Sequence, residues 1–311
     1  MGEFIIFGVN SRAEKNMNFL KTCGLDHMVQ AFCTLDKSLC HTTVGDKPVI
    51  LWDEAAKRNV PFFLAAEPNE RKAATWLLDS SGIFYSDNLI GLLSSRFGMD
   101  STWLDRMYCK YYHEYHMDRY YKTAEDETDV FWGEDSPFYR MFSLLDLTDV
   151  VELACGHGRH VEKYLDKAGS VTLVDISEKN ISYCKNRFSG IDNIRFYVNN
   201  GYDLRELKDG SYTAIFSYDS MVHFEMLDIY SYLEETRRIL KSGGRALFHH
   251  SNLMIDPKQS FYSPFNIGGR AYMSKDLFAY LAYQAGLTVT EQQIIDWSMP
   301  EMDCITLVEK Q

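Results

Sequence analysis

The sequence predicts an α/β protein with two parallel β-sheets, a smaller one near the N-terminus and a larger one in the C-terminal half. In both halves, short apolar runs alternate with amphipathic helical patterns, which is typical of strands joined by crossover helices. The stretch between the halves has no strand pattern and is rich in tyrosine. We therefore expect a small α/β domain at residues 1–90, a helical segment at 91–145 that serves as linker and as a lid over a bound ligand, and the larger α/β domain at 146–311.

The smaller domain is expected to begin with a buried strand that ends at Gly8, and its first helix is expected to end at Gly24. Asp36 follows the second strand, and "GDKPV" leads into the third. This segment resembles the small Rossmann-like domain attached to bacterial sugar-modifying enzymes. The resemblance implies recognition of a nucleotide-linked sugar or lipid-linked glycan, or assembly into a homodimer. The expected strands lie within 3–9, 28–36, 46–51 and 60–67, and the expected helices within 11–25, 52–59 and 69–83.

The linker is expected to be helical up to about Lys122 and then to become strongly acidic. We interpret the acidic stretch from Glu125 to Asp129 as a solvated connection, with a metal-binding cluster as the alternative. An aromatic segment follows it. Two interpretations stay open for Trp132 in this segment: the ring covers a bound ligand, or it packs in the core.

The larger domain has the sharper alternation of strand and helix patterns. Ser177 is placed to act as a helix N-cap, and the helix that contains Ile229 and Leu233 on one face is expected to end at Gly243. The expected strands are 149–154, 170–176, 194–200, 212–220, 245–251, 288–297 and 303–310, and the expected helices are 158–169, 177–190, 226–244 and 273–287.

The composition disfavours several classes of partner. The 32 basic and 44 acidic residues give a net charge of −12, whereas nucleic-acid-binding proteins usually carry a basic surface. No apolar run approaches the roughly 20 residues that span a bilayer. The 7 cysteines have no CxxC spacing, and the N-terminal segment lacks the features of a signal peptide. We therefore expect a cytoplasmic protein that acts on a small molecule, with no nucleic-acid partner and no membrane span.

The stretch "VELACGHGRH" carries the clearest ligand signal. Its closely spaced glycines, Gly156 and Gly158, allow a ligand to approach the backbone directly after a strand. A phosphate-binding P-loop would need Lys followed by Ser or Thr, and a dinucleotide site would need a third glycine at position 161, which is valine. Asp175 ends the next strand, where a carboxylate accepts hydrogen bonds from ribose hydroxyls. S-adenosylmethionine, which has a ribose but no phosphate, fits this pattern best.

Residues 149–311 resemble a class I S-adenosylmethionine-dependent methyltransferase. The motifs "ELACGHG", "LVDIS", "VNNGYDL" and "SYDSMVHF" follow successive strands in the family's order, and the last two strands fit its reversed C-terminal hairpin. The resemblance implies this Rossmann-like fold, S-adenosylmethionine as cofactor and S-adenosylhomocysteine as product. Asn200 lies where the family often has an aspartate that contacts adenine. The implied cofactor-binding residues are Trp132, Glu152, Ala154, Gly156, Gly158, Asp175, Ile176, Asn200, Gly201 and Tyr218.

The acceptor is expected to be a hydroxyl oxygen of a small molecule, such as the nucleotide-linked sugar of a surface-glycan precursor. The Asn/Asp-Pro-Pro-aromatic motif, which many nucleic-acid amine methyltransferases carry after strand four, is absent from "SYDSMVHF". A hydroxyl needs a base to become a good nucleophile, and histidine serves this purpose near neutral pH. The candidate catalytic residues at the strand ends are His223, which we rank first, His249, His250 and Asp219.

Arg270 and Tyr272 follow the fifth strand, where substrates usually enter, and are the candidate substrate-binding residues. Mg²⁺-assisted transfer with Asp219 as a ligand is the rival mechanism, although no acidic residue lies close to Asp219 in sequence. We therefore expect no metal. Two other functions stay open: an NAD-dependent oxidoreductase or sugar-modifying enzyme, and a cofactor-binding scaffold without catalytic activity.

Overall fold

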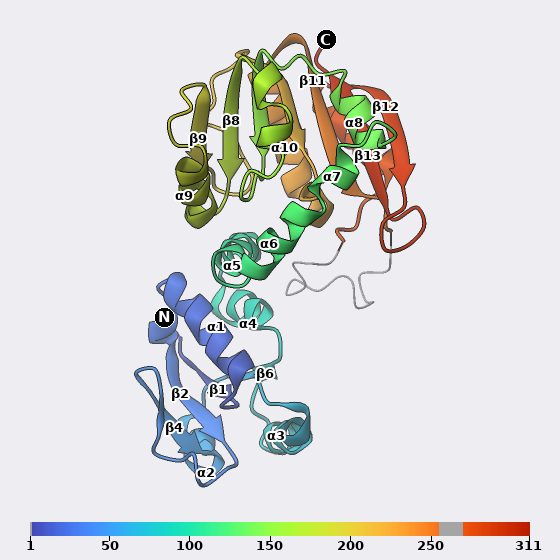
Figure 1. The fold of residues 1–311 in the computed structure, drawn as a ribbon. Helices are drawn as coiled ribbons and strands as arrows, with labels where there is room; N and C mark the ends of the chain where they lie inside the picture. The colour runs from blue at the N-terminus through green and yellow to red at the C-terminus, as the bar shows by residue number, and fades with distance from the viewer. Residues whose placement is uncertain (1, 255–269) are drawn as a thin grey trace. The chain divides into compact units, whose positions relative to one another are not determined.

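A computed structural model describes residues 2–254 and 270–311 (Figure 1). The chain divides into two compact units, Met1–Tyr111 (unit 1) and Tyr112–Gln311 (unit 2). The segment expected to form a linker, 91–145, is therefore shared between the two units. Within the described residues, no helix is both long enough and apolar enough to cross a membrane.

Unit 1 contains a six-stranded sheet with the strand order β3-β4-β2-β1-β5-β6. The strand pairs are parallel except β3 with β4. Apart from β3, this is the strand order of a Rossmann-like sheet. The strands are β1 Phe4–Phe7, β2 Val29–Thr34, β3 Thr43–Val44, β4 Lys47–Leu51, β5 Phe62–Leu64 and β6 Tyr85–Ser86, and the helices are α1 Ser11–Thr22, α2 Trp52–Ala55, α3 Pro68–Ser80, α4 Leu89–Phe97 and α5 Ser101–Tyr115, which continues into unit 2.

Unit 2 contains a seven-stranded sheet with the strand order β12-β13-β11-β10-β7-β8-β9. Strands β7 to β11 pair in parallel, and β13 is antiparallel to both β11 and β12. The predicted Rossmann-like sheet and its reversed C-terminal hairpin are thereby confirmed. The strands are β7 Asp149–Leu153, β8 Ser170–Asp175, β9 Ile194–Val198, β10 Tyr212–Ser217, β11 Leu240–Ser251, β12 Thr288–Ile295 and β13 Asp303–Glu309.

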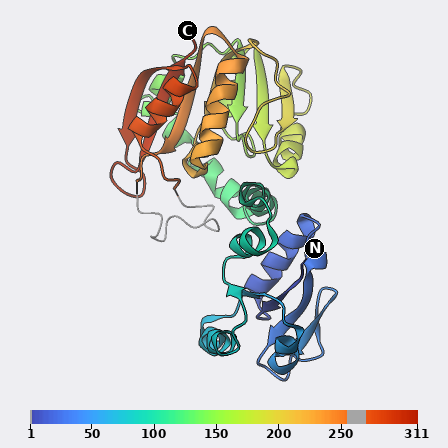
Figure 2. The ribbon, with the colours of Figure 1, turned by 180° about the vertical axis from the view of Figure 1, so that it is seen from behind.

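Helices cover both faces of the larger sheet (Figures 1 and 2). Val150 and Leu173 pack into a buried cluster with α8 and α9, whereas the next residues, Val151 and Val174, pack into a second cluster with α10 and α11. This alternation is the period of two that a strand imposes on its side chains. The helices of unit 2 are α6 Asp118–Asp126, α7 Thr128–Phe131, α8 Pro137–Phe142, α9 Glu178–Arg187, α10 Met226–Ile239 and α11 Lys275–Gln284.

Two expected helices of unit 2 differ in the structure. The helix expected at 158–169 is replaced by two 3₁₀ turns, Val161–Lys163 and Leu165–Lys167. Val161 and Tyr164 are both fully buried, and a 3₁₀ turn places residues three apart on the same side. The helix expected at 226–244 ends at Ile239, because β11 already begins at Leu240, which pairs with β10.

Candidate functional site

The glycine loop after β7 turns sharply through left-handed backbone conformations. The φ angles of Ala154, Gly156 and Gly158 are 57°, 55° and 73°. A Cβ atom on Gly158 would lie 2.7 Å from the ring of Phe188, so glycine is required where the loop meets the end of α9. The backbone N–H of Gly156 donates a 2.9 Å hydrogen bond to Oδ2 of Asp175. The loop and the end of β8 are therefore tied together.

Asp175 is 5 % exposed and is the centre of the hydrogen bonding at this edge of the sheet. Its Oδ1 accepts bonds from the backbone N–H of Ser177 at 2.9 Å and from Nδ2 of Asn180 at 3.1 Å. The carboxylate thus requires the Nδ2 group of Asn180, and not its Oδ1, to face Asp175. Among the described residues, Oδ1 of Asn180 has no hydrogen-bond partner although Asn180 is 1 % exposed. A buried acceptor without a partner is costly, so this position suits a ligand that donates a hydrogen bond.

The loop after β9 contains the residues expected near adenine. A Cβ atom on Gly201 would lie 2.7 Å from Cδ1 of Ile176, so the two residues pack closely. Oδ1 of Asn200 accepts hydrogen bonds from the backbone N–H groups of Tyr202 and Asp203, at 3.1 and 3.0 Å. The amide of Asn200 therefore stabilises its own turn, and its predicted contact with adenine stays a prediction.

Glu152 lies in β7 and is buried at 2 % exposure. Its Oε2 accepts a 2.8 Å hydrogen bond from the hydroxyl of Tyr164. Burial raises the pKa of Glu152 to about 8. The Tyr164 hydrogen bond and the charges of Arg159 and Arg187 lower this pKa, but by less than burial raises it. Glu152 is therefore mainly protonated at neutral pH and supports the strand from which the glycine loop starts.

Asp219 lies immediately after β10 with a left-handed φ of 56°. Its Oδ2 accepts hydrogen bonds from Nη2 of Arg159 at 2.9 Å and from the hydroxyl of Tyr120 at 2.8 Å. Its backbone N–H donates to Nδ1 of His249 at 3.1 Å. The ring of Tyr218, predicted to contact the cofactor, lies 4.6 Å from the ring of His249. The structure thus brings together several of the residues that sequence analysis selected.

The three candidate histidines differ in their surroundings. His249 is fully buried, and because Nδ1 accepts from Asp219, its proton resides on Nε2, 3.2 Å from Oδ2 of Asp303. His250 is also fully buried, with Nδ1 2.8 Å from the carbonyl oxygen of Ser251 and Nε2 2.8 Å from the hydroxyl of Thr306.

Burial lowers the pKa of His250 to about 3, and its ring is stacked on Phe278. These contacts favour a structural role for His250. His223 is half-buried in a 3₁₀ turn, Met221–His223, which is the first turn after β10. It is thus the most accessible of the three histidines.

Arg270 forms a buried ion pair with Asp303. It is 8 % exposed, and its Nε and Nη2 donate to Oδ1 and Oδ2 of Asp303 at 2.8 and 2.7 Å. Burial alone would raise the pKa of Asp303, but His249 and Arg270 lower it below its usual value. Tyr272 is half-buried and forms a parallel β-bridge with Leu253. The predicted substrate contacts of Arg270 and Tyr272 stay predictions.

Trp132 packs among aromatic side chains of unit 2. Its Nε1 donates a 3.0 Å hydrogen bond to Nδ1 of His160, and its ring lies 4.8 Å from that of Phe142. Burial lowers the pKa of His160 well below its usual value, so the imidazole is neutral and can accept this bond. The geometry favours core packing over the ligand-covering interpretation.

The acidic stretch after Lys122 is mostly solvent-exposed, as we expected, but it does more than connect two parts of the chain. It forms parts of α6 and α7 and pairs with basic residues of the sheet domain. Oε1 of Glu125 lies 2.6 Å from Nη1 of Arg187, and Asp129 pairs with Lys163. Because the paired residues are distant in sequence, the sequence shows their opposite charges but does not predict which residues pair. Within the described ranges, no three His, Cys, Asp or Glu side chains are grouped as a metal site requires.

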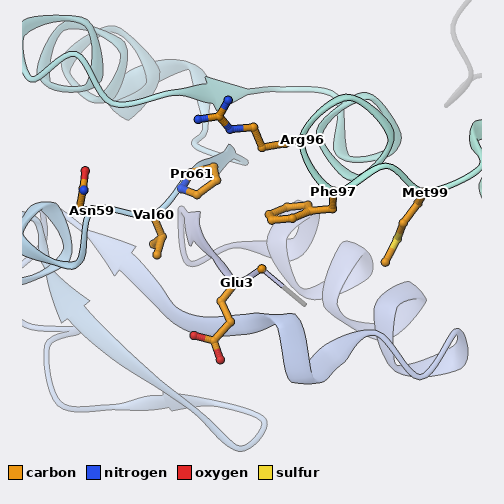
Figure 3. Close-up of a pocket in the computed structure, with 8 residues that line it drawn as sticks. Glu3, Asn59, Val60, Pro61, Arg96, Phe97 and Met99 are labelled. Carbon is orange, nitrogen blue, oxygen red and sulfur yellow. The ribbon is translucent and has the colours of Figure 1, made fainter.

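A separate hollow of about 480 Å³ lies in unit 1 (Figure 3). Glu3 precedes β1 and Pro61 precedes β5, so the hollow lies at the amino ends of these strands. Ligands of open α/β sheets bind beyond the carboxyl ends instead. All residues that line the hollow belong to unit 1, whereas Asp175 belongs to unit 2.

Residues 150–244 match a family model described as "Methyltransferase domain". The matched range, which is less than half of the 311-residue chain, includes the glycine loop, Asp175 and the end of β10. Together with the strand order of unit 2, this match supports a class I methyltransferase domain.

Solved structures of S-adenosylmethionine-dependent methyltransferases also align with the chain. A TehB-like enzyme from Corynebacterium glutamicum is 19 % identical, with 63 % of this chain and 98 % of that chain covered and a TM-score of 0.45. An enzyme from Clostridium acetobutylicum is 16 % identical, with 62 % of this chain and 99 % of that chain covered and a TM-score of 0.45. An enzyme from Mesorhizobium loti is 14 % identical, with 56 % of this chain and 97 % of that chain covered and a TM-score of 0.47. At these scores, the fold assignment depends on this chain's own strand order.

Proposed function

We propose that this chain is an S-adenosylmethionine-dependent methyltransferase that acts on a hydroxyl oxygen of a small molecule. The observation that carries the proposal is the match of residues 150–244 to a methyltransferase domain, because that range contains the glycine loop and Asp175. The NAD-dependent alternative is not favoured, since valine occupies position 161, where a dinucleotide loop has its third glycine.

The residues around Asp175 fit the cofactor's ribose. Asp175 and Oδ1 of Asn180, which has no partner among residues 2–254 and 270–311, are buried acceptors beside each other, and a ribose presents neighbouring hydroxyl donors. The close approach of Ile176 to Gly201 forms an apolar surface next to them, suited to adenine. When bound, S-adenosylmethionine supplies an electrophilic methyl group.

The protein's side chains near the transferred methyl group must hold the acceptor and remove the proton of its hydroxyl. We assign the base to His223, because it lies in the first turn after β10 and is more accessible than the fully buried His249 and His250. His249 would act as a positioning residue, since it binds the backbone N–H of Asp219.

A nucleotide-linked sugar remains our proposed acceptor class. The loose resemblance of unit 1 to domains of sugar-modifying enzymes supports it, and the strand order of unit 1 is compatible with that resemblance. A cytoplasmic location is supported by the 7 cysteines, which are all free. Assembly as a homodimer stays a prediction.

The test is release of S-adenosylhomocysteine with a panel of hydroxyl acceptors that includes nucleotide-linked sugars. Turnover of the active acceptor should rise with pH through neutrality, because the base must lose its proton. His223→Ala should lower turnover about 10²–10⁴-fold and leave cofactor affinity nearly unchanged.

Two controls distinguish the competing assignments. If His249→Gln abolished turnover while His223→Ala stayed nearly active, the base would be assigned to His249 in β11 instead. Loss of turnover on chelation, restored by Mg²⁺, would instead replace the histidine mechanism with a metal-assisted one in which Asp219 is a ligand.

A further inference from the structure

The ring of Tyr121, in α6, lies against the glycine loop. A Cβ atom on Gly156 would lie 3.0 Å from Cε1 of Tyr121. The same ring is stacked on His157 with a centroid distance of 4.4 Å, and the ring of Tyr183, in α9, lies 3.9 Å from His157. The loop's histidine is thus held between two tyrosines, one from the sheet domain's α9 and one from α6.

The hydroxyl of Tyr121 reaches the polar groups beside Asp175. It lies 2.8 Å from Nδ2 of Asn180, which donates to it, and 2.8 Å from Nδ1 of His113. Nδ2 of Asn180 also donates to Oδ1 of Asp175. Tyr121 therefore covers both the glycine loop and the residues that we propose to hold the ribose.

Electrostatic pairs hold the segment that carries Tyr121. Its acidic residues pair with basic residues of α9 and of the 3₁₀ turn after the glycine loop, and these pairs are Asp118 with Lys179, Glu125 with Arg187 and Asp129 with Lys163. The side chains of Asp118 and Asp129 are 62 % and 84 % exposed, so salt can screen their pairs. In addition, Nη1 of Arg159 donates to the carbonyl oxygen of Ala124 at 2.9 Å.

We propose that residues 118–131 form an electrostatically held gate, in which Tyr121 occupies the surface that the cofactor uses. In Figure 1, α6 lies beyond the arrowhead end of β8, the end that carries Asp175. The docked tyrosine and a bound ligand compete for the same residues, so the apparent cofactor affinity is reduced by the fraction of molecules in which the gate is closed. The inference rests on the proposed function, because it describes how that site is opened.

The first measurement is tryptic cleavage after Arg119 and Lys122 in the full chain without ligand. Tyr121→Ala should accelerate this cleavage about tenfold, because it removes both the ring packing and the hydrogen bonds of the hydroxyl. Arg187→Gln or higher NaCl should accelerate it about threefold, because partly exposed ion pairs contribute less. Arg205→Gln is the control, because it removes an ion pair to Asp203 elsewhere in unit 2. It should not change cleavage in α6.

The second measurement is the association rate of S-adenosylmethionine, followed by stopped-flow tryptophan fluorescence. The rate should increase with NaCl and in Tyr121→Ala, because opening precedes binding. Unchanged cleavage in Tyr121→Ala together with weaker cofactor binding would overturn the gate and make α6 a fixed wall of the pocket. Faster cleavage with no binding of S-adenosylmethionine to any variant would support the gate's opening while rejecting the proposed function.

Discussion

Glu152 and Asp303 are buried carboxyl groups whose pKa values shift in opposite directions. Glu152 faces one neutral donor, the hydroxyl of Tyr164, so desolvation dominates and its pKa rises to about 8. Asp303 is bound by the guanidinium of Arg270 and contacts His249, so its pKa falls in spite of burial. Partners rather than burial alone decide the charge of a buried carboxyl group. None of these partners is adjacent in sequence, so neither shift could be predicted from the sequence.

Glu152 gives a prediction about the pH dependence of stability. A carboxyl group whose folded pKa is about 8 binds its proton more tightly in the folded state, so it stabilises the fold most below about pH 4.5 and loses that contribution as pH rises to about 8. Glu152→Gln keeps an acceptor for Tyr164 and cannot ionise. Urea unfolding should therefore show that the parent loses several kcal/mol more than this variant between pH 5 and pH 8.5, at about 1.36 kcal/mol per pKa unit.

The matched control is Glu14→Gln, an exposed glutamate of α1, which should follow the parent across this pH range. Parallel pH curves for the parent and Glu152→Gln would mean that Glu152 has an ordinary pKa.

At the scale of elements, most strands were predictable from short apolar or alternating runs, but the two-residue strands β3 and β6 were missed because Thr43–Val44 and Tyr85–Ser86 are too short to show a pattern. The 3₁₀ turns that replace the expected helix were also missed. The sequence of 158–169 is compatible with a helix, but the packing of Val161 and Tyr164 against the sheet decides the local backbone. The end of α10 was misplaced for a related reason: glycine predicts a helix end, whereas pairing of Leu240 with β10 ends the helix earlier.

The ion pair of Arg270 with Asp303 fixes the segment at Arg270 to the start of β13. Removing one member of a buried pair leaves an unpaired charge, so Arg270→Met should lower the free energy of unfolding by about 3–5 kcal/mol. The double variant Arg270→Met/Asp303→Leu should recover part of that loss, because no charge remains buried. Urea denaturation of the three proteins measures both effects. If Arg270→Met kept full stability and lost only acceptor binding, Arg270 would be the substrate-binding residue that sequence analysis expected.

For the whole molecule, the fold class, the reversed hairpin and the glycine loop with Asp175 followed from motifs in sequence order. A lid within 91–145 was also expected, but the contacts of residues 118–131 with the glycine loop were not, since their acidic character alone indicated a solvated connection. Tyr121 and Asn180 were also missed, because a single tyrosine among 20 and an asparagine in a helix carry no local signal. Such residues become visible only when the fold places them beside Asp175 and Gly156.

The central claim is that the edge of the larger sheet at Asp175 binds S-adenosylmethionine. Isothermal titration of the full chain with S-adenosylmethionine and with NAD tests it most directly. We predict binding of S-adenosylmethionine but not of NAD, and a loss of about 2–4 kcal/mol of binding free energy in Asp175→Ala, with the variant's melting curve measured alongside to show that it is folded. Binding of NAD alone, or binding of S-adenosylmethionine by folded Asp175→Ala as tightly as by the parent, would contradict the account.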